Sequence, residues 1–351
     1  MLGNWYNKIL NSNFFVKLFH WEFWNFYVVY GPTIIYYLYL SFRAKSFFWI
    51  FASNPGIENA GYVGESKSGI LEKIPQTYLP KYCLIYPTIE LNKVLIMLNE
   101  NNIAFPLVAK PDVGERGQGV TIINNQDQLL ELISTVKVDY ILQEYISFPL
   151  ELGVFYYQLP KQGGVVSSVV IKEFLKVRGN GYSTLSDLIE SYPRARFRKD
   201  YLKNKFKNQW NQIIPLDKEI ILEHIGNHVR GTTFINGNYL INNQLTELFA
   251  NISQQIDGFY FGRYDLRCTN EADLYAVKNI KILELNGAGA EPAHIYQPGF
   301  SFWEGQKVLL FHWKVMFQIS MYNHAQGVAF PKWNQVKEIY KKHRQAIQNL
   351  T

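Results

Sequence analysis

Charged and amide side chains alternate along two strand-like runs in the second half of the chain. In residues 259–268 (FYFGRYDLRC), Arg263 and Asp265 are two residues apart, and in residues 278–286 (KNIKILELN), Glu284 and Asn286 have the same spacing. Residues two apart lie on one face of a strand. If the runs pair across the polar segment 269–278, then Asp265, Glu284 and Asn286 come together. Such oxygen ligands suit Mg²⁺, which usually takes one or two carboxylates and completes its shell with phosphate oxygens.

A lysine and a glycine-rich loop lie upstream of these carboxylates. Residues 107–110 (LVAK) are predicted to form a strand that ends at Lys110, and residues 120–123 a second strand. The loop between them contains Gly114, Gly117 and Gly119, whose unobstructed backbone N–H groups could bind phosphate. Lys110 could reach a polyphosphate as a point charge. A plain glycine hairpin is the alternative, and the loop is not a Walker motif because no Gly-Lys-Ser/Thr and no helix follow.

The remaining pattern indicates alternating helices and strands with no internal repeat. We expect helices over 90–101, 127–135 and 245–256, a strand over 140–146, and a hairpin of strands 151–158 and 164–177. Residues 183–210 read as helical and basic. A basic helix is more often a solvated face than a binding surface, and no known nucleic-acid module accompanies this one, so we expect no nucleic-acid partner.

Composition sets the class of protein. The 351 residues carry a formal net charge of +6 and 18% charged residues, which is typical of a globular, mildly basic chain. Two cysteines, Cys83 and Cys268, are too few for a disulfide framework and predict a cytoplasmic setting. His224 and His228 are four apart, but neighbouring glycines predict a loop there and no zinc site.

Residues 1–53 form an aromatic, helix-compatible segment of distinct composition. Residues 23–42 carry no charge, which is just enough length to span a bilayer, but Gly31-Pro32 is expected to interrupt the helix. Three readings stay open for this segment. It could lie on a membrane surface at the cytoplasmic face, span the membrane, or pack on the protein itself against the aromatic run 302–322.

The order of these motifs resembles that of the ATP-grasp superfamily over about residues 62–300. The matching parts are the Lys110 strand with its glycine loop, the QEYI strand end followed by Glu151, the Arg-x-Asp strand and the Glu-x-Asn strand. Within that superfamily the chain looks most like the group of D-Ala-D-Ala ligase, glutathione synthetase and cyanophycin synthetase. Residues 174–189 resemble a cyanophycin synthetase segment, and residues 228–233 (HVRGTT) sit where that group carries a Gly-rich strand.

The resemblance implies an α+β ATP-grasp fold, two α/β subdomains that grip ATP between antiparallel sheets, together with the aromatic helical N-terminal segment. It implies segments 1–53, 54–104 (a reduced N-terminal connector), 105–300 (the ATP-grasp domain) and 301–351 (C-terminal helices). Carried over to this sequence, ATP would be bound by Lys67, Lys110, Gly114, Gly117, Gly119, Gln143, Glu144, Ile146 and Glu151. The metal, Mg²⁺ or Mn²⁺, would be bound by Asp265, Glu284 and Asn286.

The activity implied by the resemblance is amide formation between a carboxylate and an amine through an acyl phosphate. Arg263 and Lys110 would stabilise the transferring phosphoryl group, and the turn 287–290 would receive the acyl phosphate. The substrates would be small molecules or peptides. Two alternatives remain: an ATP-binding regulator or degenerate ligase that makes no product, and a phosphotransferase. Glu291, directly after the turn, is unusual for the group.

Overall fold

The computed structural model describes residues 12–350 apart from residue 116, and its chain divides into two compact units. The larger unit comprises residues 33–171, 236–294 and 306–351, and the smaller comprises 1–32, 172–235 and 295–305. Each unit is therefore built from segments far apart in the sequence. The structure is a mixed α and β fold whose paired strands are antiparallel, as the α+β expectation required.

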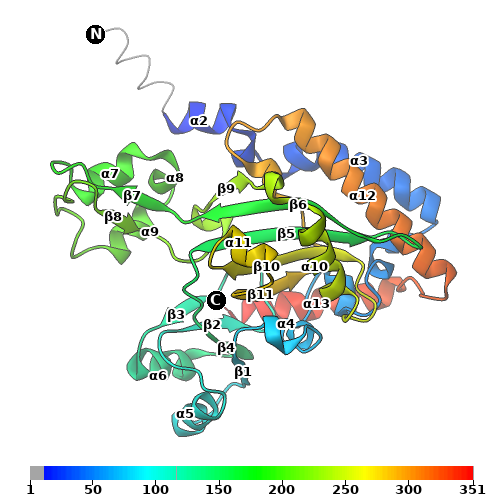
Figure 1. The fold of residues 1–351 in the computed structure, drawn as a ribbon, viewed down its shortest axis with the longest axis horizontal. Helices are drawn as coiled ribbons and strands as arrows, with labels where there is room; N and C mark the ends of the chain where they lie inside the picture. The colour runs from blue at the N-terminus through cyan, green and yellow to red at the C-terminus, as the bar shows by residue number, and fades with distance from the viewer. Residues whose placement is uncertain (1–11, 116, 351) are drawn as a thin grey trace. The chain divides into compact units, whose positions relative to one another are not determined.

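A small sheet in the larger unit carries the predicted Lys110 strand (Figure 1). Its strand order is β1-β4-β2-β3. Helices α5 and α6 pack on it through Val94, Leu98, Leu129 and Ile133, so the apolar stripe of each helix is buried against the strands. The bounds of these elements are β1 Tyr82–Ile85, α5 Leu91–Glu100, β2 Leu107–Pro111, β3 Thr121–Ile123, α6 Gln126–Thr135 and β4 Tyr140–Glu144.

A five-stranded sheet in the order β11-β10-β5-β6-β9 carries the predicted carboxylates. Alternate residues of β5 enter opposite cores. Val154 and Tyr156 pack with helix α10, whereas Phe155 and Tyr157 pack with helix α12. Both faces of the sheet are thus covered. The bounds are β5 Leu150–Gln158, β6 Gly164–Glu173, β9 Thr233–Asn236, α10 Asn243–Ser253, β10 Phe261–Cys268, β11 Ile280–Asn286 and α12 Phe302–Ala325.

The connection between β10 and β11 differs from the expected polar turn because it contains a short helix, α11 (Glu271–Tyr275). The Asn270 side chain caps this helix by accepting a hydrogen bond from Asp273 N at 2.8 Å. Acidic Glu271 and Asp273 occupy the first turn, where the helix dipole favours negative charge. The capping signal was present in the sequence, but five residues are too few for helical periodicity to show.

The aromatic N-terminal segment is helical. The prediction that Gly31-Pro32 would interrupt the helix is wrong. Helix α3 (Phe26–Ala44) continues through Pro32. In the larger unit its Leu40 and Ala44 pack with Trp49, Val315 and Ile319, and the Tyr37 and Trp313 rings lie 5.5 Å apart. Figure 1 shows α3 and α12 side by side. One face of α3 therefore packs against the aromatic run 302–322, which was one of the three readings of the sequence. These tertiary contacts outweigh the backbone hydrogen bond that proline removes from the helix.

No helix in the described ranges, 12–115 and 117–350, is long and apolar enough to cross a membrane. Several short elements and the C-terminal helix α13 complete the larger unit. They are η2 Trp49–Ala52, η3 Glu58–Gly61, α4 Lys67–Leu71, η4 Gln76–Tyr78, η6 Asn238–Leu240, η7 Ala293–Tyr296, which ends in the smaller unit, and α13 Trp333–Gln348.

The smaller unit has its own core around a two-stranded sheet, β7 with β8. Leu185, Ile189, Leu202 and Leu222 are buried there. The predicted helical, basic region 183–210 forms three short helices, and Pro193 begins the second of them. The bounds are α2 Asn13–Phe19, η1 Trp21–Phe23, β7 Lys176–Arg178, α7 Leu185–Ser191, α8 Pro193–Arg196, α9 Lys199–Lys205, β8 Glu219–Ile221 and η5 His228–Arg230.

Candidate active site

The two carboxylate strands pair as predicted, and Asp265 lies directly opposite Glu284 in the antiparallel register of β10 and β11. Asn286 Nδ2 donates a hydrogen bond to Asp265 Oδ2 at 3.1 Å, so all three predicted metal ligands meet at one place. No group of three or more His, Cys, Asp or Glu side chains suited to a metal occurs in the described part of the chain. The donor set here is accordingly two carboxylates and one amide, which suits a cation that also takes oxygens from its substrate.

A β-bulge lies within this cluster. Between Asp265 and Leu266 the register shifts, and the ladder passes from Glu284 to Ile282, so Leu283 lies between paired residues. The Leu283 carbonyl accepts a hydrogen bond from Lys110 Nζ at 2.9 Å. Bulges often redirect groups next to active sites. This one gives the Lys110 ammonium an acceptor on the carboxylate strand.

Arg263 forms a two-pronged ion pair with Asp265. Its Nε lies 2.8 Å from Asp265 Oδ1 and its second terminal nitrogen lies 3.0 Å from Oδ2. The other terminal nitrogen donates to the Glu291 carbonyl at 3.2 Å, which gives the residue after the turn a contact that the sequence did not predict. Paired N–H groups in this geometry hold the guanidinium in place. Arg263 is thus fixed beside the predicted metal ligands.

The two predicted lysines both reach this cluster. Lys110 is 7% exposed, and besides Leu283 O it contacts Gln143 Oε1 at 3.1 Å. Burial lowers the pKa of Lys110 to about 8, although the nearby Glu284 carboxylate opposes the shift. Lys67 Nζ lies 3.8 Å from Glu284 Oε1 and donates to the Gly114 carbonyl. Two ammonium groups therefore flank Glu284.

Asp112 positions Lys67, a role that the sequence did not predict. Its carboxylate accepts a hydrogen bond from Ser68 N at 2.7 Å, and its carbonyl accepts one from Lys67 N at 3.0 Å. The Ser66 side chain caps α4 by accepting from Gly69 N at 3.0 Å. The first residues of α4 are therefore fastened to the end of β2. A carboxylate directly after the Lys110 strand was the only local signal.

The glycine loop joins β2 to β3, and its residue 116 lies outside the described residues. Gly117 and Gly119 have φ values of +71° and +72°, a left-handed conformation that glycine adopts without strain. A Cβ atom at Gly114 would stand 3.0 Å from Pro111 Cγ and 3.4 Å from the Leu350 side chain. These positions thus need glycine for backbone geometry and for close packing.

The predicted adenine and ribose residues lie at the ends of β4 and β5. Gln143 is 3% exposed, and its Nε2 has no hydrogen-bond partner within the described residues. Glu144 Oε2 accepts from Lys81 N at 3.1 Å. A buried donor without an acceptor is costly. Gln143 Nε2 is therefore the atom of this group that most requires a ligand.

Arg267 joins two of the predicted nucleotide contacts and was also missed. Its Nε donates to Glu151 Oε2 at 2.8 Å, and a terminal nitrogen donates to the Ile146 carbonyl. Arg267 and Glu151 are a directly opposed pair of β10 and β5, and both are buried. The Arg-x-Asp-x-Arg spacing put Arg267 on the face of Asp265, but only the register reveals its partner. Arg267 positions Glu151 and the Ile146 carbonyl.

The Gly287–Ala290 turn binds another part of the chain. Ala288 N donates to the Ala60 carbonyl and Gly289 N to the Gly61 carbonyl, each at 2.9 Å. A Cβ atom at Gly287 would stand 2.4 Å from the Ala60 oxygen, so the approach requires glycine. The turn therefore holds segment 60–61 against the carboxylate strand.

Comparison with known proteins gives distant structural similarity. No family model matches the chain, and no curated protein matches its sequence. Similar solved structures include a bifunctional glutathione synthetase from Pasteurella multocida (15% identity, TM-score 0.38, covering 69% of this chain and 35% of that one). They also include D-alanine–D-alanine ligase from Bacillus anthracis (12%, 0.40, 73% and 68%) and VanG D-Ala:D-Ser ligase from Enterococcus faecalis (14%, 0.36, 77% and 62%). The chain thus spans about a third of the glutathione synthetase and about two thirds of the B. anthracis ligase.

Proposed function

We propose that this protein is an ATP-grasp enzyme, an ATP- and Mg²⁺-dependent ligase that joins a carboxylate to an amine through an acyl phosphate. The observation that carries the proposal is the meeting, within one compact unit, of two lysine ammonium groups, one arginine and two carboxylates. Such an arrangement suits a polyphosphate held with a divalent cation. The order of the motifs along the chain supports the same conclusion.

The nucleotide would lie between the two sheets of the larger unit. Lys110 and Lys67 would bind its phosphates, and the glycine loop would close over them. Gln143 Nε2, buried and without a partner in the part of the chain that the structure describes, would donate to an adenine nitrogen. Arg267 holds Glu151 and the Ile146 carbonyl, where they would meet the ribose and the adenine edge. Glu144 lies at the same strand end.

The residues present fit a divalent cation. Asp265 and Glu284 supply carboxylates and Asn286 an amide oxygen, which agrees with the usual Mg²⁺ donor set. Asp265 Oδ1 accepts from Arg263, and Oδ2 accepts from both Arg263 and Asn286 Nδ2. Turning the Asn286 amide so that its oxygen faces the cation would remove the second donor from Oδ2 and make a lone pair available there. When bound, Mg²⁺ would neutralise charge on the phosphates.

The chain's own residues would carry the chemistry as follows. Lys67, Lys110 and Arg263 would hold the terminal phosphate while a substrate carboxylate attacks it, and they would balance the charge that develops. Closure of the glycine loop would exclude water, which would otherwise hydrolyse the acyl phosphate. The amine then replaces phosphate at the carbonyl carbon. No protein nucleophile is required by this route.

The exposed face of α3 supports association with a membrane surface. Ile35, Leu38, Tyr39 and Phe42 lie on this face, and Phe42 is 84% exposed. No Asp or Glu occurs in residues 33–53, whereas Arg43 and Lys45 are present. Aromatic and apolar side chains beside basic ones suit an anionic lipid surface. We therefore place this face on the headgroup region of an anionic membrane.

Vesicle flotation tests the membrane contact. Phe42→Ser should weaken binding to vesicles rich in anionic lipid by about tenfold or more, since a buried Phe contributes roughly 1.5–3 kcal/mol. Tyr86→Ser is the matched control because Tyr86, directly after β1, is also an exposed aromatic residue at 56%. Equal binding of wild type and Phe42→Ser would refute the membrane contact and leave the ligase proposal intact.

A screen for ADP release tests the ligase itself. The full chain, ATP, Mg²⁺ and panels of carboxylic acids and amines should release ADP and phosphate only when an acid and an amine are both suitable. Binding of ATP with no ADP release from any combination would favour a regulator without product. A stable phosphorylated product in the absence of any amine would favour a phosphotransferase.

A further inference from the structure

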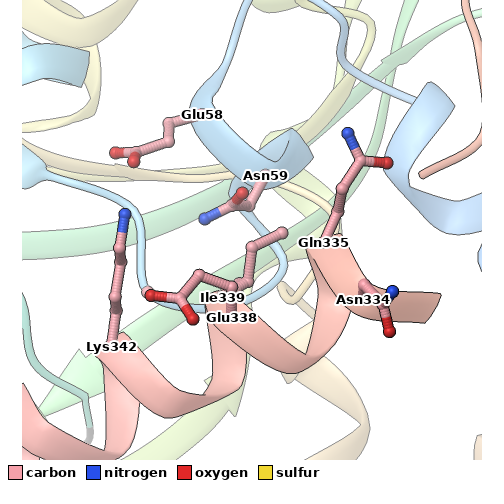
Figure 2. Close-up of a pocket in the computed structure, with 8 residues that line it drawn as sticks. Glu58, Asn59, Asn334, Gln335, Glu338, Ile339 and Lys342 are labelled. Atoms are coloured by element: carbon pink, nitrogen blue, oxygen red, sulfur yellow. The ribbon is translucent and has the colours of Figure 1, made fainter. Parts of the chain in front are cut away.

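A cavity of about 520 Å³ lies between segment 58–64 and the C-terminal helix α13, both in the larger unit. Figure 2 shows the side chains of Glu58 and Asn59 facing those of Glu338 and Lys342, while Asn334 points away. Glu58 is held in place because its Oε2 accepts a hydrogen bond from Ser66 N at 3.1 Å. Most of the lining residues have polar side chains, with carboxylates from both walls and one ammonium, although aliphatic carbon atoms make up most of the surface that faces the cavity.

A carboxylate and an imidazole next to the cavity each have a buried atom without a partner. Glu65 Oε2 and His343 Nδ1 are both buried and have no hydrogen-bond partner within the described residues. Gly64, which lines the cavity, packs on His343, since a Cβ atom there would stand 3.2 Å from His343 Cβ. Glu65 Oε2 is an acceptor when the carboxylate is ionised, and His343 Nδ1 is an acceptor when the ring proton is on Nε2. An ammonium group has three N–H donors and could serve both atoms in that state.

Burial raises the pKa of Glu65 above its ordinary value, and the negative charge of Glu284 adds to the shift, although a backbone hydrogen bond, Lys67 and His343 oppose it. A cationic ligand would offset the cost of burying this carboxylate. A cation beside Glu65 would oppose this shift and favour the ionised carboxylate.

The same segment leads directly to the candidate reaction site. Ala60 and Gly61 accept hydrogen bonds from Ala288 N and Gly289 N of the turn that follows the metal-ligand strand. Lys67, two residues after Glu65, lies 3.8 Å from Glu284 Oε1. In the sequence, Glu65 thus follows Gly64, which lines the cavity, and precedes Lys67, which contacts Glu284, on a segment whose residues 60 and 61 the turn holds.

We propose that α13 and segment 58–65 form the subsite for the amine substrate, and that Glu65 and His343 bind the ammonium group of an amino acid or short peptide. The rest of that substrate would occupy the cavity, where the Lys342 ammonium suits its carboxylate. This assignment rests on the ligase function proposed above. It makes the C-terminal helix one wall of the subsite that selects the amine.

The transfer balances with this substrate. The amine nitrogen forms a bond to the acyl carbon, and the bond between that carbon and the phosphate oxygen breaks. The acyl phosphate and R′NH₃⁺ yield the amide, HPO₄²⁻ and one H⁺. Of the two protons that nitrogen loses, one leaves with phosphate and one passes to solvent.

Direct binding tests the subsite without requiring turnover. The full chain with ¹⁵N-labelled histidine is titrated with n-butylammonium and with β-alanine, and the His343 signals are identified with His343→Gln. We expect both probes to shift the His343 signals. Glu65→Gln should weaken the binding of each probe by about tenfold, which corresponds to the loss of one charge-assisted hydrogen bond. Glu90→Gln, an exposed carboxylate on another part of the unit, is the matched control. Unmoved His343 signals, or equal binding by Glu65→Gln, would overturn the assignment.

Comparing two nucleophiles tests the amine subsite separately from the ligase function. Hydroxylamine, a small nucleophile without an ammonium tail, traps acyl phosphates as hydroxamates. Glu65→Gln and His343→Gln should lose about tenfold more kcat/KM with the amine substrate than with hydroxylamine. Equal losses with both nucleophiles would contradict an amine subsite. If the wild type binds n-butylammonium at His343 but releases no ADP, the subsite stands and the ligase proposal fails.

Discussion

Lys67 and Glu284 face each other in the candidate active site, with Lys67 Nζ 3.8 Å from Glu284 Oε1. The same ammonium donates to the Gly114 carbonyl and so links the glycine loop to the carboxylate strand. Phosphate oxygens would compete with both partners for this ammonium, because a triphosphate carries more charge than a carbonyl or one carboxylate. Bound nucleotide would therefore weaken the contacts of Lys67 with both the glycine loop and the carboxylate strand.

Replacing Glu284 with Gln should abolish most turnover while preserving the fold. The substitution keeps the size of the side chain but removes a charge that would hold the cation, and loss of one such electrostatic group typically costs on the order of a hundredfold or more in rate. ADP release at saturating Mg²⁺ is the measurement, with Glu90→Gln as control. An active Glu284→Gln enzyme would remove Glu284 from the metal site.

Lys110 should make ATP binding weaker at alkaline pH. Burial lowers its pKa to about 8, so the free protein loses this ammonium as the pH rises through 8, whereas phosphate binding needs it charged. The dissociation constant of ATP, measured by calorimetry from pH 7 to pH 9.5, should therefore increase above pH 8. Lys110→Met should bind more weakly at pH 7 and should lack that part of the increase. The same dependence in Lys110→Met would assign the titration to another group.

The same shift has a consequence for stability. Because the folded-state pKa lies below the ordinary 10.5, the unfolded chain binds more protons between about pH 8 and 10.5. Burying the charged Lys110 therefore lowers the free energy of unfolding, and this effect is complete below pH 8. It disappears as the pH rises from about 8 to 10.5. In Lys110→Met, stability should be higher at pH 7, and this contribution to its pH dependence should be absent.

Gly153 should be intolerant of even one added methyl group. A Cβ atom there would stand 2.8 Å from Val170 Cγ1, 3.0 Å from Asp265 Oδ1 and 3.1 Å from Arg263 Cδ. Gly153→Ala should displace the Arg263 and Asp265 pair and reduce ADP release by about tenfold or more, since small misplacements of catalytic groups are costly. Gly163→Ala is the matched control because no atom lies within 4 Å of its Cβ position. Equal activity of the two variants would show that the pair can move without loss.

A buried ion pair fastens the N-terminal segment within the smaller unit. Arg194 lies 2.6 Å from Glu22 Oε2, both side chains are at most 7% exposed, and His228 Nε2 lies 3.5 Å from the same oxygen. Burial alone would raise the pKa of Glu22, but the neighbouring His228 and the charge of Arg194 outweigh it and lower the pKa. The stabilising contribution is thus present above the ordinary value of 4.5 and is lost as the pH falls through the lowered pKa.

Glu22→Gln should therefore destabilise this unit at pH 7, by about 3–5 kcal/mol for a broken buried pair, and much less in acid. Hydrogen exchange of the amides of residues 193–198 measures the effect locally. Glu190→Gln is the control because Glu190 forms an ion pair with Lys199 at half-exposed side chains. Unchanged exchange at pH 7 would show that the pair does not stabilise the unit.

The sequence predicted the parts of the site that depend on local pattern. Strand alternation placed Asp265 beside Glu284, and the Lys110 strand with its glycine loop followed from residues 107–123. Long-range relationships were not readable from it. Register and tertiary packing determine three features of the site. They are the bulge at Leu283, the ion pair of Arg267 with Glu151, and the close approach of Gly287 to the Ala60 backbone. Helix α3 passes through Pro32 because its contacts with α12 outweigh the local preference to break.

The C-terminal helix shows the same limit most clearly. A helical 333–348 could be expected from composition, but its periodicity does not say which surface it covers. His343 becomes informative only when it is seen beside Gly64 and near Glu65. The residues that we assign to the amine subsite therefore come from the structure.

In the proposed mechanism a carboxylate oxygen attacks the terminal phosphorus of ATP, so this oxygen should be transferred to the released phosphate. Turnover with a carboxylic acid labelled with ¹⁸O in its carboxyl group, ATP and an amine should place one ¹⁸O atom in the released inorganic phosphate. Mass spectrometry of the phosphate measures this. Phosphate without label, or label recovered in AMP, would contradict an acyl phosphate intermediate in this protein.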